Sequence, residues 1–167
     1  MFKIKDVYKC HILYFCFKII FMQLPEELKA AINGNAFCAM ATHMNNEEIQ
    51  NHLMWIDYLD DYLIINTEKG RQKTYNIRGN NNISLVIFEP HAMYSSWEIR
   101  GEVEEVIDDN TANNHIDKVS NRYTGHPYNR EEDVSWDEAQ IKDREMWKIK
   151  INKLNSMVRP QAKSEPE

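Results

Sequence analysis

Residues 66–78 read Asn66-Thr67-Glu68-Lys69-Gly70-Arg71-Gln72-Lys73-Thr74-Tyr75-Asn76-Ile77-Arg78 and follow the apolar, strand-like run Tyr62-Leu63-Ile64-Ile65. The segment from residue 70 onward has the character of a helix, so its basic residues lie at a predicted strand-to-helix junction. The free N–H groups and the dipole of a first helical turn attract anions. At the same site, Arg71 would add a planar guanidinium that can form two parallel hydrogen bonds, and Lys73 would add a compact positive charge. The junction therefore predicts a phosphate site, with a solvated basic surface as the alternative.

Composition narrows the class of protein. The chain has 167 residues, of which 43% are apolar and 11% aromatic, and this predicts one globular domain. A net charge of -6 argues against general nucleic-acid binding, which normally shows a basic surplus. Cys10, Cys16 and Cys38 form no CxxC pair, and the histidines show no ligand spacing. We therefore expect a reducing, cytoplasmic location and no metal.

Both ends of the chain are expected to lie outside the fold. Residues 10–22 are nearly all apolar and follow several lysines, as in a signal peptide, but no small-residue cleavage site precedes Leu24. The run is also too short and too charged for a membrane span. We expect residues 1–21 to be an extension, with an interfacial anchor as the alternative. The domain then covers residues 22–157, and the tail at 158–167 is expected to be disordered.

Short apolar segments separated by turns predict a mainly β fold. About six strands are expected, with few helices, as in a barrel; the strands are at 36–42, 48–58, 62–66, 83–88, 97–107 and 146–151, and the helices at 24–33, 70–79 and about 109–123. Residues 83–88 are apolar except for Ser84, which predicts burial on both faces. In 97–107, Trp97, Ile99, Gly101 and Val103 share one face. Short connections imply antiparallel pairing, and residues 126–144 are expected to form a loop.

The order of several short motifs resembles the pyridoxamine 5'-phosphate oxidase-like FMN-binding split β-barrel superfamily, and within it the PPOX class F-420-dependent oxidoreductases. The segments that carry the resemblance are 39–42, 54–58, 65–77, 86–90, 97–103, 115–118 and 122–125. The resemblance implies an α+β fold, a six-stranded antiparallel split β-barrel with flanking helices. Its usual assembly is a homodimer with two cofactor sites at the interface.

The resemblance also implies which residues contact a flavin mononucleotide (FMN) or the deazaflavin coenzyme F-420. They lie on the second strand, the third strand and the helix that follows: His52, Met54, Trp55, Asn66, Thr67, Arg71, Lys73, Thr74 and Asn76. The Arg-x-Lys pair would clamp the phosphate, with Thr74 and Asn76 at neighbouring polar positions. The second strand would lie along the ring, with Asn66 and Thr67 beneath it.

The implied function is hydride transfer between reduced F-420, or FMN, and a small organic acceptor. The cofactor would supply the chemistry, and the sequence shows no Ser/His/Asp set or carboxylate pair that would act as catalytic residues. The alternatives are a non-catalytic flavin or haem binder of the same fold, an FMN-dependent enzyme like pyridoxamine-phosphate oxidase, and a barrel that binds another anion. Two departures from the family pattern are Leu53, where a proline is common, and the first hairpin at 44–48.

Overall fold

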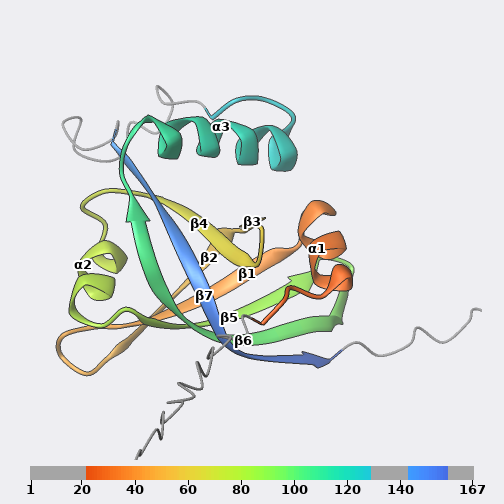
Figure 1. Cartoon of the computed structure of the whole chain (residues 1–167), viewed down its shortest axis with the longest axis horizontal. Coiled ribbons are helices and arrows are strands. Elements are labelled where there is room, and N and C mark those ends of the chain that lie inside the picture. Colours follow the sequence, from red (N-terminus) through yellow and green to blue (C-terminus); the bar gives the residue numbers. More distant parts are fainter. Residues whose placement is uncertain (1–21, 129–142, 158–167) are drawn as a thin grey trace, which may run out of the picture.

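The computed structural model describes residues 22–128 and 143–157 (Figure 1). The expected extension at 1–21, the expected tail at 158–167 and most of the expected loop at 126–144 lie outside the described residues. Among the residues that are described, no helix has the length and apolar character needed to cross a bilayer.

Among the described residues, seven strands form one antiparallel sheet in the order β2-β1-β5-β6-β7-β4-β3. Their bounds are β1 Phe37–His43, β2 Ile49–Trp55, β3 Asp57–Leu59, β4 Tyr62–Glu68, β5 Asn82–Glu89, β6 Ala92–Ile107 and β7 Arg144–Met157. Figure 1 shows the sheet strongly curled, so that β2, at one edge, approaches β4. The predicted mainly β, antiparallel split barrel is therefore confirmed, with seven strands in place of six.

The seventh strand arises because the expected strand at 48–58 is two strands. β2 ends at Trp55 against β1, whereas β3 begins at Asp57 against β4, and Ile56 between them leaves the ladder. The main chain of Ile56 is instead bound from α3, where Tyr123 accepts from its N–H and Arg122 donates to its carbonyl. Side-chain alternation gives no sign of such an exchange of partner strands, because both strands remain extended.

In the part of the chain that the structure describes, three helices flank the sheet, and each was predicted: α1 Glu26–Asn33, α2 Gln72–Gly79 and α3 Asn110–Thr124. α2 begins two residues later than expected, because Arg71 is extended and forms its N-cap. Asp109 caps α3 by accepting from the Thr111 N–H, and Gly125 ends it in the left-handed conformation at φ 84°. In Figure 1, α3 lies across β4 and the start of β7.

The core lies inside the curl of the sheet, where side chains from alternate positions meet. Trp97, Ile99 and Val103 are buried as predicted, and Trp147 packs with them in the same cluster. The prediction that β5 is buried on both faces is wrong. Its side chains alternate, and Val86 is 41% exposed, because one face of this antiparallel sheet packs on the core while the other is open.

Candidate functional site

A cavity of about 290 Å3 lies at the opening of the curled sheet, between β2 and β4. Its wall combines apolar side chains of β1, β2 and α3 with polar side chains of β4, α3, β7 and the N-cap of α2. The lining residues are Phe37, Leu53, Met54, Trp55, Asn66, Thr67, Glu68, Arg71, His115, Ile116, Val119, Tyr128 and Arg144. Within the described sheet, β2 is an edge strand that pairs with β1. The other side of its main chain therefore offers N–H and C=O groups to a ligand.

The charged end of this cavity is built where β4 passes into α2. The Nε of Arg71 donates to Oε2 of Glu68 over 2.6 Å, and an Nη of Arg71 contacts the same oxygen. The other oxygen of Glu68 accepts from Arg144 Nη1 at 3.1 Å and from the Tyr128 hydroxyl at 3.2 Å. Because Glu68 is buried, these protein donors replace water in stabilising its charge.

Lys73 lies beside this cluster, in the first turn of α2, and is only 2% exposed. Among the described residues its ammonium makes no hydrogen bond or ion pair. Burial lowers the pKa of Lys73 from 10.5 to about 8, and the positive charges of Arg71 and Arg144 act in the same direction against the opposing effect of Glu68. Buried lysines are normally paired, so the position of Lys73 calls for an anion that the described residues do not supply.

The floor of the cavity is polar because of two residues of β4. Thr67 is buried, and its hydroxyl has no hydrogen-bond partner within the described chain. The Asn66 amide is fully used: its oxygen accepts from Arg144 Nε at 2.8 Å, and its nitrogen donates to the Ala112 carbonyl at 2.7 Å. Thr67 is therefore the floor residue with a polar group still available to a ligand.

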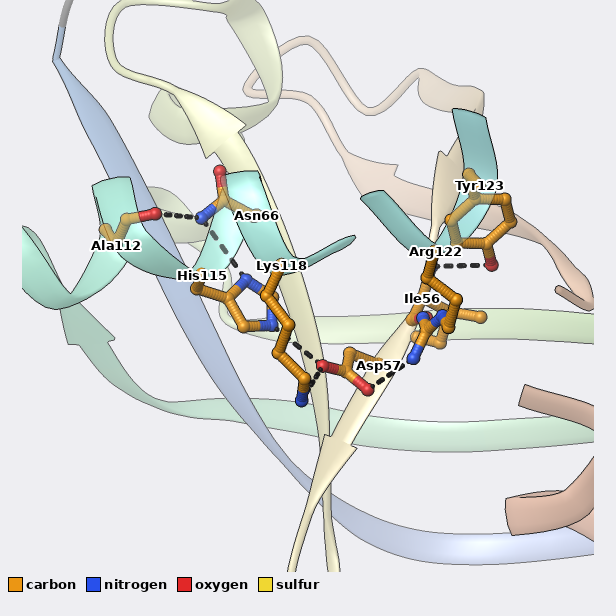
Figure 2. Close-up of polar contacts among 8 residues, drawn as sticks. All are labelled: Ile56, Asp57, Asn66, Ala112, His115, Lys118, Arg122 and Tyr123. Carbon is orange, nitrogen blue, oxygen red and sulfur yellow. Dashed lines mark hydrogen bonds and ion pairs between the residues drawn. The ribbon is translucent and has the colours of Figure 1, made fainter. Parts of the chain in front are cut away.

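On the opposite side, α3 is pinned to β3 by one carboxylate (Figure 2). Asp57, buried on β3, accepts from Lys118 Nζ at 2.8 Å, Arg122 Nη1 at 2.8 Å and His115 Nε2 at 3.2 Å. Burial alone would raise the pKa of Asp57, but the hydrogen bonds from these three residues outweigh it and hold the pKa well below its ordinary value. The cluster fixes the helix whose residues form one wall of the cavity.

The hydrogen bonds around Asn66 also assign the tautomer of His115. Because the Asn66 oxygen faces Arg144, its NH2 group faces Nδ1 of His115 at 3.4 Å (Figure 2). Nδ1 is then the acceptor, and Nε2 carries the proton that is donated to Asp57. His115 thus stands in the cavity wall as an oriented ring held at both nitrogens.

The structure brings some of the predicted site residues together and not others. The cavity wall includes Met54, Trp55, Asn66, Thr67 and Arg71. One face of Trp55 is covered by Tyr123, with ring centroids 5.2 Å apart and an angle of 9° between the planes.

The remaining predicted residues lie behind the wall or beside it. The Thr74 hydroxyl donates to the Arg71 carbonyl at 2.8 Å, which closes the first turn of α2. Asn76 donates to Thr42 at 2.9 Å and Gln50 at 3.0 Å, so it ties α2 to the β1–β2 hairpin.

His52 is exposed on β2, close enough to the basic cluster to feel its charge. Its pKa is lowered by partial burial and by the charges of Lys73 and Arg71.

The sequence interpretation missed Glu68, Arg144, Tyr128, Asp57 and His115. Glu68 stands inside the stretch that was singled out, but its burial between two arginines depends on β7, which is distant in sequence. The residues of α3 that bind Asp57 had a usable signal in the sequence, since residues 115, 118 and 122 recur at helical spacing and all have basic side chains. What they bind was not readable from that spacing. Among the described residues, no group of three or more potential ligands is placed to hold a metal ion.

Comparisons with known proteins bear on this arrangement. The model of the pyridoxamine 5'-phosphate oxidase family matches residues 24–157. Among solved structures, an F420 reductase is 23% identical with a TM-score of 0.65, over 79% of this chain and 98% of that chain. A conserved hypothetical protein from Mycobacterium tuberculosis is 20% identical (TM-score 0.60, 82% and 86% covered). General Stress Protein 26 from Bacillus anthracis is 17% identical (TM-score 0.58, 79% and 92% covered). No curated protein sequence matches the chain.

Proposed function

The chain belongs to the pyridoxamine 5'-phosphate oxidase family, and we propose that it binds F-420 or FMN in the cavity between β2 and β4 and transfers hydride between this cofactor and a small organic acceptor. The observation that carries the proposal is Lys73, a buried cation without an anionic partner among the described residues, beside Arg71 at the start of a helix. A phosphate ester is the anion that this arrangement suits best.

Charge and hydrogen bonding both support the fit of a phosphorylated ring. Arg71, Lys73 and Arg144 surround the single carboxylate of Glu68, so two positive charges remain for a phosphate dianion among the described residues. The buried Thr67 hydroxyl, on the floor, has hydrogen-bonding capacity to spare. In this proposal Arg71 and Lys73 hold the phosphate, Thr67 contacts the ring or its chain, and Thr74 and Asn76 hold α2 in place.

When bound, the flavin or deazaflavin ring supplies the hydride chemistry. The residues of this chain position the ring and shield it from water. The apolar side chains of Met54 and Trp55 would lie along it, and the free edge of β2 would hydrogen-bond its polar rim. Ile116 and Val119 of α3 would limit the space left for an acceptor. The structural likeness to an F420 reductase favours F-420 as the first cofactor to test.

The direct test is to titrate the purified protein with FMN and with F-420 in parallel, using cofactor fluorescence. The wild-type protein should bind at least one of them, and an Arg71→Glu, Lys73→Glu variant should lose roughly 3 kcal/mol or more of binding free energy. A preference for FMN would place the chain among FMN-dependent enzymes. Unchanged affinity in the double variant would refute the phosphate site.

Multiple-turnover oxidation of the reduced cofactor, with a panel of small acceptors, separates an enzyme from a binding protein. An enzyme should consume many equivalents of reduced cofactor per protein chain. A protein that binds tightly but turns over none of the acceptors would instead be a carrier or sensor of the same fold.

We further propose that the protein is a homodimer whose interface covers the mouth of the cavity. The outer faces of β1, β2 and β5 form an apolar stripe, in which Ala39 lies between Leu53, 73% exposed, and Val86. Phe37 and Leu53 belong both to this stripe and to the cavity wall. Val86→Glu should shift the sedimentation of a dimer to that of a monomer. Val106→Glu, equally exposed on β6, is the matched control and should leave the assembly unchanged.

A further inference from the structure

Both carboxylate oxygens of Glu68 are bound by side chains at the charged end of the cavity. One of its oxygens accepts from Arg71 through Nε, at 2.6 Å, and Nη. The other accepts from Arg144 at 3.1 Å and Tyr128 at 3.2 Å. Glu68 is 5% exposed and its side chain forms part of the cavity wall. A carboxylate thus occupies the guanidinium edge that a phosphate would use.

The two arginines differ in their freedom to leave this carboxylate. The Arg71 side chain is 42% exposed and stands at the N-cap of α2, so it can turn toward a ligand. Arg144 is buried, and its Nε is bound to Asn66 at 2.8 Å. When Arg71 turns away, Arg144 and Tyr128 still hold Glu68 in place. The negative charge of Glu68 then remains beside the bound anion.

We propose that Glu68 is an internal competitor of the ligand's phosphate for Arg71, and that it thereby weakens the preference of the site for phosphorylated ligands. This inference rests on the proposed function, because it assigns the strength of the same anion site. Binding of a phosphate replaces one charge-assisted contact of Arg71 by another, so that contact adds little affinity. Glu68 also repels the incoming dianion across a short distance in a partly buried site. Lys73 contributes the larger gain, because within the described chain its ammonium makes no hydrogen bond or ion pair with Glu68 that a phosphate would have to replace.

A pair of ligands that differ only in the phosphate isolates this effect. FMN and riboflavin share the ring and the ribityl chain, so the ratio of their dissociation constants reports the phosphate alone. Glu68→Gln keeps the size and the polar end of the side chain but removes its charge. We expect this variant to raise the preference for FMN over riboflavin by about tenfold, with riboflavin affinity changed by less than about threefold.

Glu145→Gln is the matched control. Glu145 is also a fully buried carboxylate, bound to Arg78 at 2.9 Å and to the Trp147 indole at 2.8 Å, and it is not part of the cavity wall. Its neutral variant should leave the FMN preference at the wild-type value. An unchanged or a lower FMN preference in Glu68→Gln would overturn the proposal. A lower value would mean that Glu68 orients Arg71 for the phosphate instead of competing with it.

A second variant and a second probe keep the inference testable if Glu68→Gln does not fold or if flavins do not bind. Glu68→Asp keeps the charge but withdraws it from Arg71, so its FMN preference should also rise, by a smaller factor; a fall would contradict competition. Inorganic phosphate is the probe that needs no flavin. It should raise the thermal midpoint of the Glu68 variant more than that of the wild type, and an equal rise would overturn the proposal. A larger phosphate response without any flavin binding would refute the proposed function and support this role of Glu68.

Discussion

Replacing Lys73 by methionine should make the unliganded protein more stable. Methionine keeps the unbranched stem of the side chain and removes the buried ammonium, which has no hydrogen bond or ion pair within the described residues. A core lysine is normally stabilised by its partner, and its loss is then destabilising. Here the partner is the ligand that we propose, so the substitution should separate stability from binding.

The magnitude follows from the pKa of Lys73, which burial lowers from 10.5 to about 8. At about 1.4 kcal/mol for each pH unit, this difference corresponds to roughly 3 kcal/mol of free energy that the folded state loses by keeping the ammonium charged. The methionine variant should regain about 1–3 kcal/mol at neutral pH, with roughly 3 kcal/mol as the upper bound. For a chain of this size, that is a rise of about 3 °C in the thermal midpoint for each kcal/mol.

The pH dependence has a definite sign. Between pH 8 and 10.5 the unfolded chain keeps the Lys73 proton while the folded protein has released it. The unfolded state therefore binds more protons, and the free energy of unfolding of the wild type should rise with pH across this window. The methionine variant should lack this rise.

Urea unfolding at neutral pH and at several values between 8 and 10.5 measures both effects. Lys69→Met is the control, because Lys69 is partly exposed and pairs with Asp108 at 3.2 Å. It should change stability by less than about 1 kcal/mol and keep the pH dependence. A less stable Lys73→Met protein would show that Lys73 has an internal partner, and a variant that keeps the rise with pH would show that another group causes it. In either case Lys73 would not mark the site of a missing anion.

Three further predictions concern the scaffold. Asp57→Asn should lower the free energy of unfolding in urea by about 3 kcal/mol, since it leaves buried donors of α3 without their carboxylate. In the wild type, the stability that Asp57 contributes is fully present above its ordinary pKa of 3.8. It is lost only as the pH falls toward the lower pKa of the folded state. Gly101→Ala should lower the thermal midpoint strongly, because the Cβ of the new alanine would lie 2.4 Å from the Lys150 carbonyl oxygen. A variant with wild-type stability would contradict this close approach of β6 to β7. Tyr123→Phe should cost about 1–2 kcal/mol by chemical unfolding, since its hydroxyl bonds two main-chain groups, whereas Tyr75→Phe, at an exposed hydroxyl, should be neutral.

Elements whose signals are local were predictable from the sequence. The alternation of Trp97, Ile99 and Val103 gave the inward face of β6, because a half-buried strand exposes every second side chain. The helix expected at about 109–123 was found as α3, because its ends depend on local signals: Asp109 and Gly125 each act within one turn of the helix. The break at Ile56 and the open face at Val86 were not predictable. Both depend on which strand or surface lies opposite, and that is set by tertiary packing.

The same distinction applies to the candidate site. Arg71 and Lys73 stood out because cations gather over a few residues of an acidic chain, beside a predicted helix start. Asp57 and His115 did not, because the carboxylate and its donors are 58 or more residues apart and meet only when α3 lies on β3. The role of Glu68 could not be predicted for a related reason, since Arg144, the second arginine that binds it, comes from β7.

The balance of charge around Asp57 differs from that around Glu68. This difference separates the cluster that stabilises the fold from the cluster that we propose binds a ligand. Around Asp57, the donors in excess of the carboxylate are the His115 imidazole and Lys118, whose side chain is 66% exposed and reaches water. Each cation of this cluster lies against the carboxylate, although the buried Nε of Arg122 has no hydrogen-bond partner among the described residues. Around Glu68, one of the two excess positive charges is that of Lys73, which is buried and has no partner in the described chain. Since a buried unpaired charge reduces stability, its presence beside a cavity is more readily explained by anion binding than by folding.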